Sequence, residues 1–210
     1  MPQNERPALR LDRHGWLHPA PFVSLHPSPN FNERPPGCDA SLLVLHNISL
    51  PPGRFGGPEV IDFFLNRLDH DAHPWFEHIR GMRVSAHFFI RRDGAIVQFV
   101  STHQRAWHAG VSVFEERERC NDFSIGIELE GTDTLPYADA QYGALQRLLP
   151  ALRARHTLRA VRGHEHIAPG RKTDPGPSFD WKRFGRENGI QRRYLPPAAV
   201  SPPKGRRNPR

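Results

Sequence analysis

Apolar runs along the chain predict several β-strands. Residues 42–45 are four consecutive apolar residues followed directly by His46, a pattern typical of a central strand buried on both faces. Residues 85–91 and 95–100 flank Asp93-Gly94, and this dipeptide favours the tight turn of a β-hairpin. The pattern therefore predicts a buried strand that presents His46 at its tip, and a separate hairpin.

Residues 123–131 alternate between apolar and polar positions, which predicts another strand. One face would carry Phe123, Ile125, Ile127 and Leu129, and the other Ser124, Gly126, Glu128 and Glu130. A glycine inside a strand allows close approach of another group, and we expect Gly126 to leave room for a ligand. The polar face of this strand is thus a candidate wall of a site.

Helical spacing marks two further segments. In residues 58–68, one face holds Val60, Phe63, Phe64 and Leu68, and residues 138–156 repeat leucine at helical spacing. A short strand is expected at 159–163, while residues 1–40 are proline-rich and mostly irregular, with Trp16 as an anchor onto the body. The order of elements predicts an α/β fold, a single domain with a central mixed β-sheet flanked by helices.

The charge of the chain is concentrated at its C-terminus. Residues 182–210 carry nine Lys or Arg and one acidic residue, a net charge of +8 against +7 for all 210 residues. The body is therefore close to neutral, which argues against nucleic acid as a partner. We expect residues 186–210 to be a basic, proline-rich, disordered tail, after a catalytic domain at 41–185 and the N-terminal segment 1–40.

Cysteine usage and the N-terminus favour a cytosolic protein. Cys38 and Cys120 are the two cysteines, too few for a disulfide framework. The first residues lack the apolar run of a secretory signal, and we expect no membrane association because no stretch approaches the length of a membrane span. We expect a cytoplasmic monomer.

Residues 163–177 carry the side chains best suited to a metal site. His164, Lys172 and Asp174 lie within eleven residues, and two Pro-Gly pairs fold the segment back on itself. An imidazole and a carboxylate supply two of the three protein ligands of a catalytic zinc site, and an ammonium suits a developing oxyanion. His46 offers the third ligand and Glu128 a general base, which together would complete a hydrolytic site.

Four ordered blocks of the chain resemble one known family. They are Leu45–Gly53, Arg105–Gly110, Arg117–Gly131 and Arg171–Gly176. These blocks are similar to those of the cytosolic AmpD-type amidases, which are zinc N-acetylmuramoyl-L-alanine amidases acting on anhydromuropeptides. The similarity runs from about Gly15 to Phe184, and it implies the amidase fold shared with peptidoglycan recognition proteins.

The resemblance implies a role for each matching residue. His46, His164 and Asp174 would bind one Zn²⁺, Glu128 would be the general base and Lys172 would stabilise the transition state. The positions that would contact the anhydromuropeptide substrate are Asn47, Arg83, Trp107 and Arg119. The implied reaction is hydrolysis of the amide between the lactyl group of muramic acid and L-alanine, in peptidoglycan recycling.

Several alternatives remain open from the sequence. His166 stands where a carboxylate is expected in relatives, so either His164 or His166 could be the ligand. Glu130 shares the face of Glu128 and could instead pair with a cation, while His87 is expected to be a hydrogen-bonded core group. The alternative function is a catalytically silent muropeptide sensor, which would be expected to lack a metal ligand or the base.

Overall fold

Two parallel strands, β3 (Leu42–Ile48) and β9 (Ser124–Glu130), form the centre of the fold and pair along their whole length. The computed structural model describes residues 8–197. Residues 42–46 and all of β9 are buried, because protein packs on both faces of the sheet. The strand predicted from the apolar run at 42–45 is confirmed, although it continues to Ile48 and so places His46 inside the strand.

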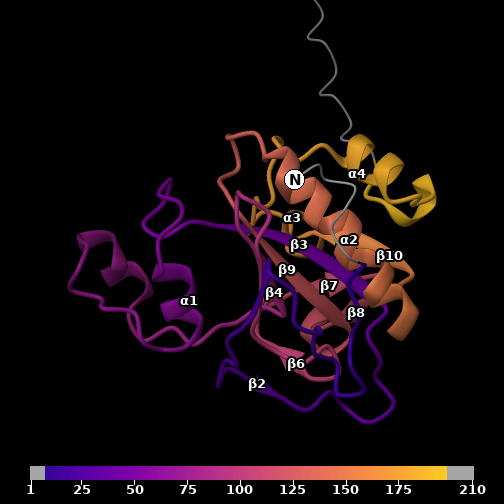
Figure 1. Ribbon diagram of the computed structural model, residues 1–210, viewed down its shortest axis with the longest axis horizontal. Helices are drawn as coiled ribbons and strands as arrows, with labels where there is room; N and C mark the ends of the chain where they lie inside the picture. The colour runs from indigo at the N-terminus through magenta and orange to yellow at the C-terminus, as the bar shows by residue number, and fades with distance from the viewer. Residues whose placement is uncertain (1–7, 198–210) are drawn as a thin grey trace, which may run out of the picture.

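These strands belong to a six-stranded mixed sheet in the order β1-β5-β4-β9-β3-β10, of which β4, β9, β3 and β10 are labelled in Figure 1. The other members are β1 (Val23–Leu25), β4 (Phe88–Ile90), β5 (Ile96–Gln98) and β10 (Ala160–Gly163). Within this sheet β4 and β5 pair antiparallel and the remaining neighbours pair parallel. Gly94 adopts φ 82° in the turn between β4 and β5, which confirms the predicted hairpin.

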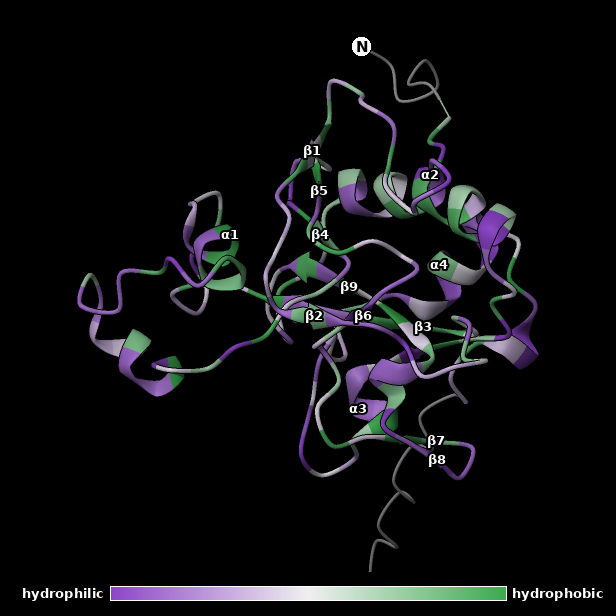
Figure 2. Cartoon of the chain, turned by 90° about the horizontal axis from the view of Figure 1, so that it is seen from below, coloured by the Kyte–Doolittle hydropathy of each residue, from purple (hydrophilic) through white to green (hydrophobic). Residues whose placement is uncertain are grey.

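Helices cover one face of the sheet and a shorter set of elements covers the other (Figure 2). On one side lie α2 (Asp139–Arg155) and α4 (Trp181–Glu187), and on the other lie α3 (His164–Ile167) and the hairpin of β7 (Val113–Phe114) and β8 (Arg117–Glu118). The leucines repeated along α2 are buried against β3 and β9, as their spacing predicted. Within residues 8–197, no helix has both the length and the apolar character needed to cross a bilayer.

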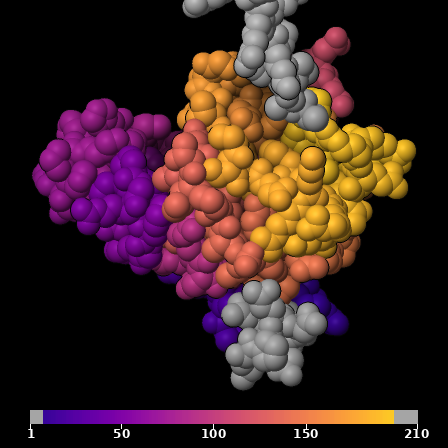
Figure 3. Space-filling view, turned by 90° about the horizontal axis from the view of Figure 1, so that it is seen from above, coloured from indigo at the N-terminus to yellow at the C-terminus, as the bar shows by residue number. Residues whose placement is uncertain are grey.

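Residues 50–84 connect β3 to β4 and form a lobe beside the sheet, coloured purple to magenta in Figures 1 and 3. It contains α1 (Glu59–Phe64) and the 3₁₀-helix η2 (Pro74–Ile79). The apolar face predicted for 58–68 is buried, but the helix is shorter than expected. Asn66 has φ 58°, a left-handed conformation that ends the helix.

The N-terminal segment is less irregular than its proline content predicts. β1 extends the main sheet, and β2 (Phe31–Asn32) pairs with β6 (Arg105–Ala106). Leu17 is 2% exposed, whereas the expected anchor Trp16 is only half-buried. Leu17 is therefore buried more deeply than Trp16 and is the main anchor of this segment.

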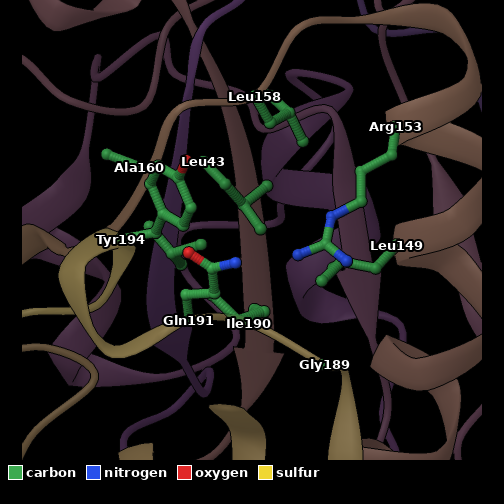
Figure 4. Close-up of a pocket in the computed structure, with 10 residues that line it drawn as sticks. Leu43, Leu149, Arg153, Leu158, Ala160, Gly189, Ile190, Gln191 and Tyr194 are labelled. Carbon is green, nitrogen blue, oxygen red and sulfur yellow. The ribbon is translucent and has the colours of Figure 1, made fainter.

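The sequence predicts a disordered tail from residue 186, which is too early. Ile190 and Leu195 are buried in the core shared with α2, and the 3₁₀-helix η4 (Arg192–Tyr194) lies between them. A cavity of about 240 Å³, lined by Leu43, Leu149 and other mainly apolar side chains, remains between this segment, α2 and β10 (Figure 4). Residues 186–197 thus pack on the body, while 198–210 lie outside the described residues.

Phe123 also departs from the expected alternation. It ends the 3₁₀-helix η3 (Cys120–Asp122) with φ −132° and ψ 19°, which are not the angles of a strand. Its ring consequently packs with Leu42 and Val44 on the face opposite to Ile125, Ile127 and Leu129.

Candidate functional site

His46, His164 and Asp174 converge at one edge of the sheet. Their ligand atoms all lie within 4.8 Å of one another. His46 Nδ1 is 3.0 Å from His164 Nδ1 and 3.0 Å from Asp174 Oδ2, and His164 Nδ1 is 3.2 Å from the same carboxylate oxygen. His46 is on β3 and His164 directly follows β10, the parallel neighbour of β3, so the pairing of the strands brings the two rings together.

The chemistry of these donors fits a metal cation. His164 Nε2 is 3.0 Å from the carbonyl oxygen of Ala109, which can only accept, so the proton of His164 is on Nε2 and its Nδ1 lone pair faces the cluster. Burial lowers the pKa of His46 to about 4, with Asp174 opposing this shift. Burial raises the pKa of Asp174, but contacts with His164 and His46 outweigh it and lower that pKa below its usual range. Two neutral imidazoles and a carboxylate are a ligand set of catalytic zinc.

Glu128 lies beside this cluster. It pairs in register with His46 across β9 and β3, so both side chains leave the sheet on the same face. Burial raises the pKa of Glu128 well above its usual value, Asp174 adds to the effect and Lys172 opposes it. Among the described residues, Glu128 Oε2 has no hydrogen-bond partner. A carboxyl group with a free oxygen and a raised pKa is suited to accept a proton.

A cavity of about 520 Å³ opens over these groups. One wall holds the polar side chains His46, Glu128, His164, Lys172 and Asp174. The lobe supplies an apolar wall, with Phe63, Phe64, Trp75, Ile79 and Met82 among its residues. A site with reactive groups on one side and an apolar surface on the other can hold an amphipathic small molecule.

The residues expected to contact substrate divide into two pairs. Asn47 and Trp107 line the cavity. Asn47 Nδ2 donates to Asp133 Oδ1 at 2.7 Å, and Trp107 Nε1 donates to Asn32 Oδ1 at 2.7 Å, so both side chains are held in place.

Arg83 and Arg119, by contrast, are exposed and do not line the cavity in this structure. Arg119 Nε instead lies 3.4 Å from Asp122 Oδ2. The structure therefore does not bring these two arginines to the reacting groups.

His108 was missed by the sequence reasoning, although it lies within one of the resembling blocks. It is 9% exposed, its Nδ1 lies 2.9 Å from His46 Nε2 and its Nε2 lies 3.1 Å from Ser124 Oγ. A β-carbon on Gly126 would be 2.5 Å from Cγ of His108. The space above Gly126 thus holds the His108 ring, and not an approaching ligand as the sequence suggested.

The structure shows the contacts of three side chains whose roles the sequence left open. His166 Nδ1 accepts from the Gly163 N–H at 3.0 Å and its ring meets Trp181 edge-on, so His166 points away from the cluster. Glu130 accepts from the backbone N–H groups of Gly56 and Arg92, and therefore binds loops instead of a cation. His87 Nδ1 accepts from the Gly126 N–H, which confirms a hydrogen-bonded core role.

Comparison with known proteins agrees with this geometry. The family described as N-acetylmuramoyl-L-alanine amidase matches residues 38–177. The 1,6-anhydro-N-acetylmuramyl-L-alanine amidase AmpD of Citrobacter freundii is 59% identical over 172 residues, which cover 81% of this chain and 90% of the relative.

Solved structures show the same relationship. A selenomethionine derivative of AmpD superposes with a TM-score of 0.80 at 56% identity, covering 84% of this chain and 98% of that one. The amidase AmiD of E. coli, in complex with anhydro-N-acetylmuramic acid-L-Ala-D-γ-Glu-L-Lys, has a TM-score of 0.52 at 26% identity, covering 87% of this chain and 66% of that one. The chain therefore belongs to the N-acetylmuramoyl-L-alanine amidase family, and within it to the AmpD-type enzymes.

Proposed function

We propose that this enzyme uses one Zn²⁺ to hydrolyse the amide between the lactyl group of 1,6-anhydro-N-acetylmuramic acid and L-alanine. The observation that carries the proposal is the convergence of His46, His164 and Asp174 beside the unpartnered carboxylate oxygen of Glu128. The names of the AmpD relatives and the anhydromuropeptide bound to AmiD support the choice of substrate.

His46, His164 and Asp174 would hold the metal, which when bound supplies Lewis acidity and lowers the pKa of water. Glu128 accepts the proton of the attacking water at Oε2 and returns it to the leaving amine of L-alanine. Lys172, at the wall of the cavity, places its ammonium near the oxygen that becomes negative as the carbonyl is attacked. Fixed charges of this kind stabilise the transition state because they need no reorganisation during the reaction.

Trp107 and Asn47 are the side chains that we propose hold the substrate over the reacting groups. The Trp107 ring offers a flat apolar surface to a sugar, and its bond to Asn32 fixes its orientation. Asn47 Nδ2 donates to Asp133 Oδ1 and to the carbonyl oxygen of Pro175, which fixes the side-chain amide at the wall of the cavity, where we propose that it contacts the peptide. Arg83 and Arg119 would meet only a part of the peptide that extends beyond the cavity.

We further propose that the enzyme acts as a cytosolic monomer in peptidoglycan recycling. Both cysteines are free, as expected in a reducing compartment. Size-exclusion chromatography with light scattering measures the mass in solution, and fractionation of expressing cells measures the location.

The test of function is incubation of purified protein with a synthetic anhydromuropeptide, followed by mass spectrometry. We expect free peptide and free anhydro sugar, loss of the reaction after chelation and recovery on addition of zinc. Glu128→Gln should bind the substrate without cleaving it. Binding by the unaltered, zinc-loaded protein without cleavage would instead favour the silent sensor and overturn the proposed function.

A further inference from the structure

The two histidines of the proposed metal site each use the ring nitrogen that faces away from Asp174 to contact the same short segment, residues 108–109. His46 Nε2 lies 2.9 Å from His108 Nδ1, and His164 Nε2 lies 3.0 Å from the carbonyl oxygen of the next residue, Ala109. The ring nitrogens that face Asp174 are therefore the Nδ1 atoms of both histidines. Two consecutive residues thus hold the side of each imidazole that faces away from the cluster.

The side-chain amide of Asn121 holds this segment through its backbone N–H groups, and Arg171 Nη2 donates to the carbonyl oxygen of Ala109 at 2.9 Å. Asn121 Oδ1 accepts from the backbone N–H of His108 at 3.1 Å and from that of Ala109 at 2.8 Å. Asn121 is 6% exposed and lies on η3, immediately before β9. Its own carbonyl oxygen accepts from Arg34 Nη1 at 3.1 Å. The segment is therefore tied to the strand that carries Glu128.

The hydrogen-bond chain from Ser124 through His108 to His46 can run in either of two directions. In one, His46 Nε2 donates to His108 Nδ1 and His108 Nε2 donates to Ser124 Oγ, which leaves a lone pair on His46 Nδ1. In the other, the proton sits on His46 Nδ1 and blocks it as a metal ligand. The direction of this chain decides whether His46 can bind metal.

We propose that His108 is a positioning residue that selects the Nε2–H tautomer of His46, and that Asn121 holds His108 and Ala109 so that both histidine ligands present Nδ1 to the metal. This inference rests on the proposed zinc-dependent function. His108 lines the cavity, but its Nδ1 contacts His46 and its Nε2 contacts Ser124, so neither ring nitrogen is free to bind the ion. It supplies the acceptor that a metal-binding histidine usually finds in a carboxylate or a carbonyl.

The test compares two substitutions of His108 in the full-length protein. His108→Leu keeps the bulk but removes the acceptor, whereas His108→Asn keeps an acceptor oxygen close to the position of Nδ1. Zinc affinity is measured by competition with a chromogenic chelator, and the tautomer of His46 by long-range ¹H–¹⁵N spectra of the imidazoles. We expect His108→Leu to weaken zinc binding about 10–100-fold, and His108→Asn to recover most of the affinity.

Asn121 provides an independent arm of the experiment. Asn121→Asp keeps the accepting oxygen and Asn121→Ala removes it, without altering any metal ligand. We expect Asn121→Ala to weaken zinc binding, and Asn121→Asp to retain it more fully. Circular dichroism of the metal-free variants shows that each has folded.

Three results would overturn the inference. One is wild-type zinc affinity in His108→Leu, and another is equal weakening in His108→Leu and His108→Asn, which would reflect packing alone. The third is a zinc-loaded wild-type spectrum with the His46 proton on Nδ1. If the wild-type protein binds no zinc at all, the proposed function fails as well, and this outcome is distinct from the other three.

Discussion

Gly126 and His108 are in contact so close that no β-carbon fits between them. A carbon built on Gly126 would lie 2.5 Å from Cγ and 2.6 Å from Nδ1 of the His108 ring. Gly126 is in the middle of β9, which cannot shift without moving its partners β3 and β4. The position of the His108 ring therefore depends on the absence of a side chain on the neighbouring strand.

Substitution Gly126→Ala is expected to displace His108 and to weaken zinc binding. Overpacking of this kind costs about 1–3 kcal/mol of stability. Gly185→Ala is the matched control, because its β-carbon would lie 2.5 Å from Leu195 Cδ1, in the core on the α4 side of the sheet. Denaturant unfolding measures the stability of each variant, and chelator competition should show a loss of zinc affinity only in Gly126→Ala. Equal zinc affinity in the two would contradict the role given to Gly126.

The two histidines that follow Gly163 should behave differently. His164→Ala removes a member of the metal cluster, and we expect zinc content to fall from one per chain to near zero. His166→Ala removes the acceptor of the Gly163 N–H and the ring contact with Trp181, which should cost about 1 kcal/mol or more of stability and leave zinc in place. Metal analysis of dialysed protein measures both. Retention of zinc by His164→Ala would mean that the ligand was assigned to the wrong residue.

Substitutions of Glu128 and of Lys172 should lower activity without lowering metal content. Glu128→Gln is expected to lower kcat by about 10²–10⁴-fold and Lys172→Ala by about 10²–10³-fold, while zinc stays bound. The double variant need not show the product of the two losses, because both groups act on one transition state. Turnover is measured at matched zinc occupancy. Glu130→Gln is the control, and it should mainly lower stability because Glu130 binds two backbone N–H groups.

The composition of the C-terminal segment predicts disorder, whereas its packing predicts that removing the segment lowers the stability of the protein. A chain ending at Gly189 lacks Ile190 and Leu195, which are 8% and 7% exposed. Burial of such side chains contributes about 1.5–3 kcal/mol each, so we expect Tm to fall by roughly 6 °C or more. A chain ending at Pro197 keeps both residues and is the control. Scanning calorimetry of the two would refute the packing if their Tm values agreed.

Acid should destabilise the protein partly through His87. Burial, reinforced by Arg34, lowers the pKa of His87 to about 3, from about 6.5 in the unfolded chain. Between these values the unfolded chain binds a proton that the folded protein does not, so stability falls as the pH drops through this window.

His87→Asn should make this dependence flatter, because the asparagine oxygen can still accept from Gly126 but does not titrate. At about 1.4 kcal/mol per pKa unit, the wild type should lose roughly 2–3 kcal/mol more than the variant between pH 7 and pH 4.5. Urea unfolding of the metal-free proteins measures the difference. Parallel pH profiles would show that His87 is not the titrating group.

The sequence predicted those parts of the fold that have a local pattern. The apolar run of β3, the turn at Gly94 and the leucine repeat of α2 each define an element without reference to the rest of the chain. The tail was misjudged because two apolar residues, Ile190 and Leu195, hardly change the composition of a basic, proline-rich segment. Their burial depends on the surface of α2, which is distant in sequence.

The same distinction applies to the site. His46, Glu128, His164, Lys172 and Asp174 were identified because their residue types match a hydrolytic centre and a family resemblance joins them. His108 lies within one of the resembling blocks, but nothing in that block indicates its role, which arises from contact with a ring 62 residues earlier in the chain. A residue that acts through another residue is defined by tertiary packing, and a local pattern cannot reveal it.

The two walls of the cavity belong to different parts of the chain, because the lobe of residues 50–84 supplies the apolar wall and none of the polar one. Its side chains, Trp75 and Met82 among them, supply surface but none of the proposed reacting groups, while Phe63 and Phe64 of the lobe pack with Phe89 of the sheet. Exchanges on that wall can alter which peptides fit while the polar wall stays as it is. The range of peptides that fit and the rate of hydrolysis can therefore change separately during the evolution of this fold.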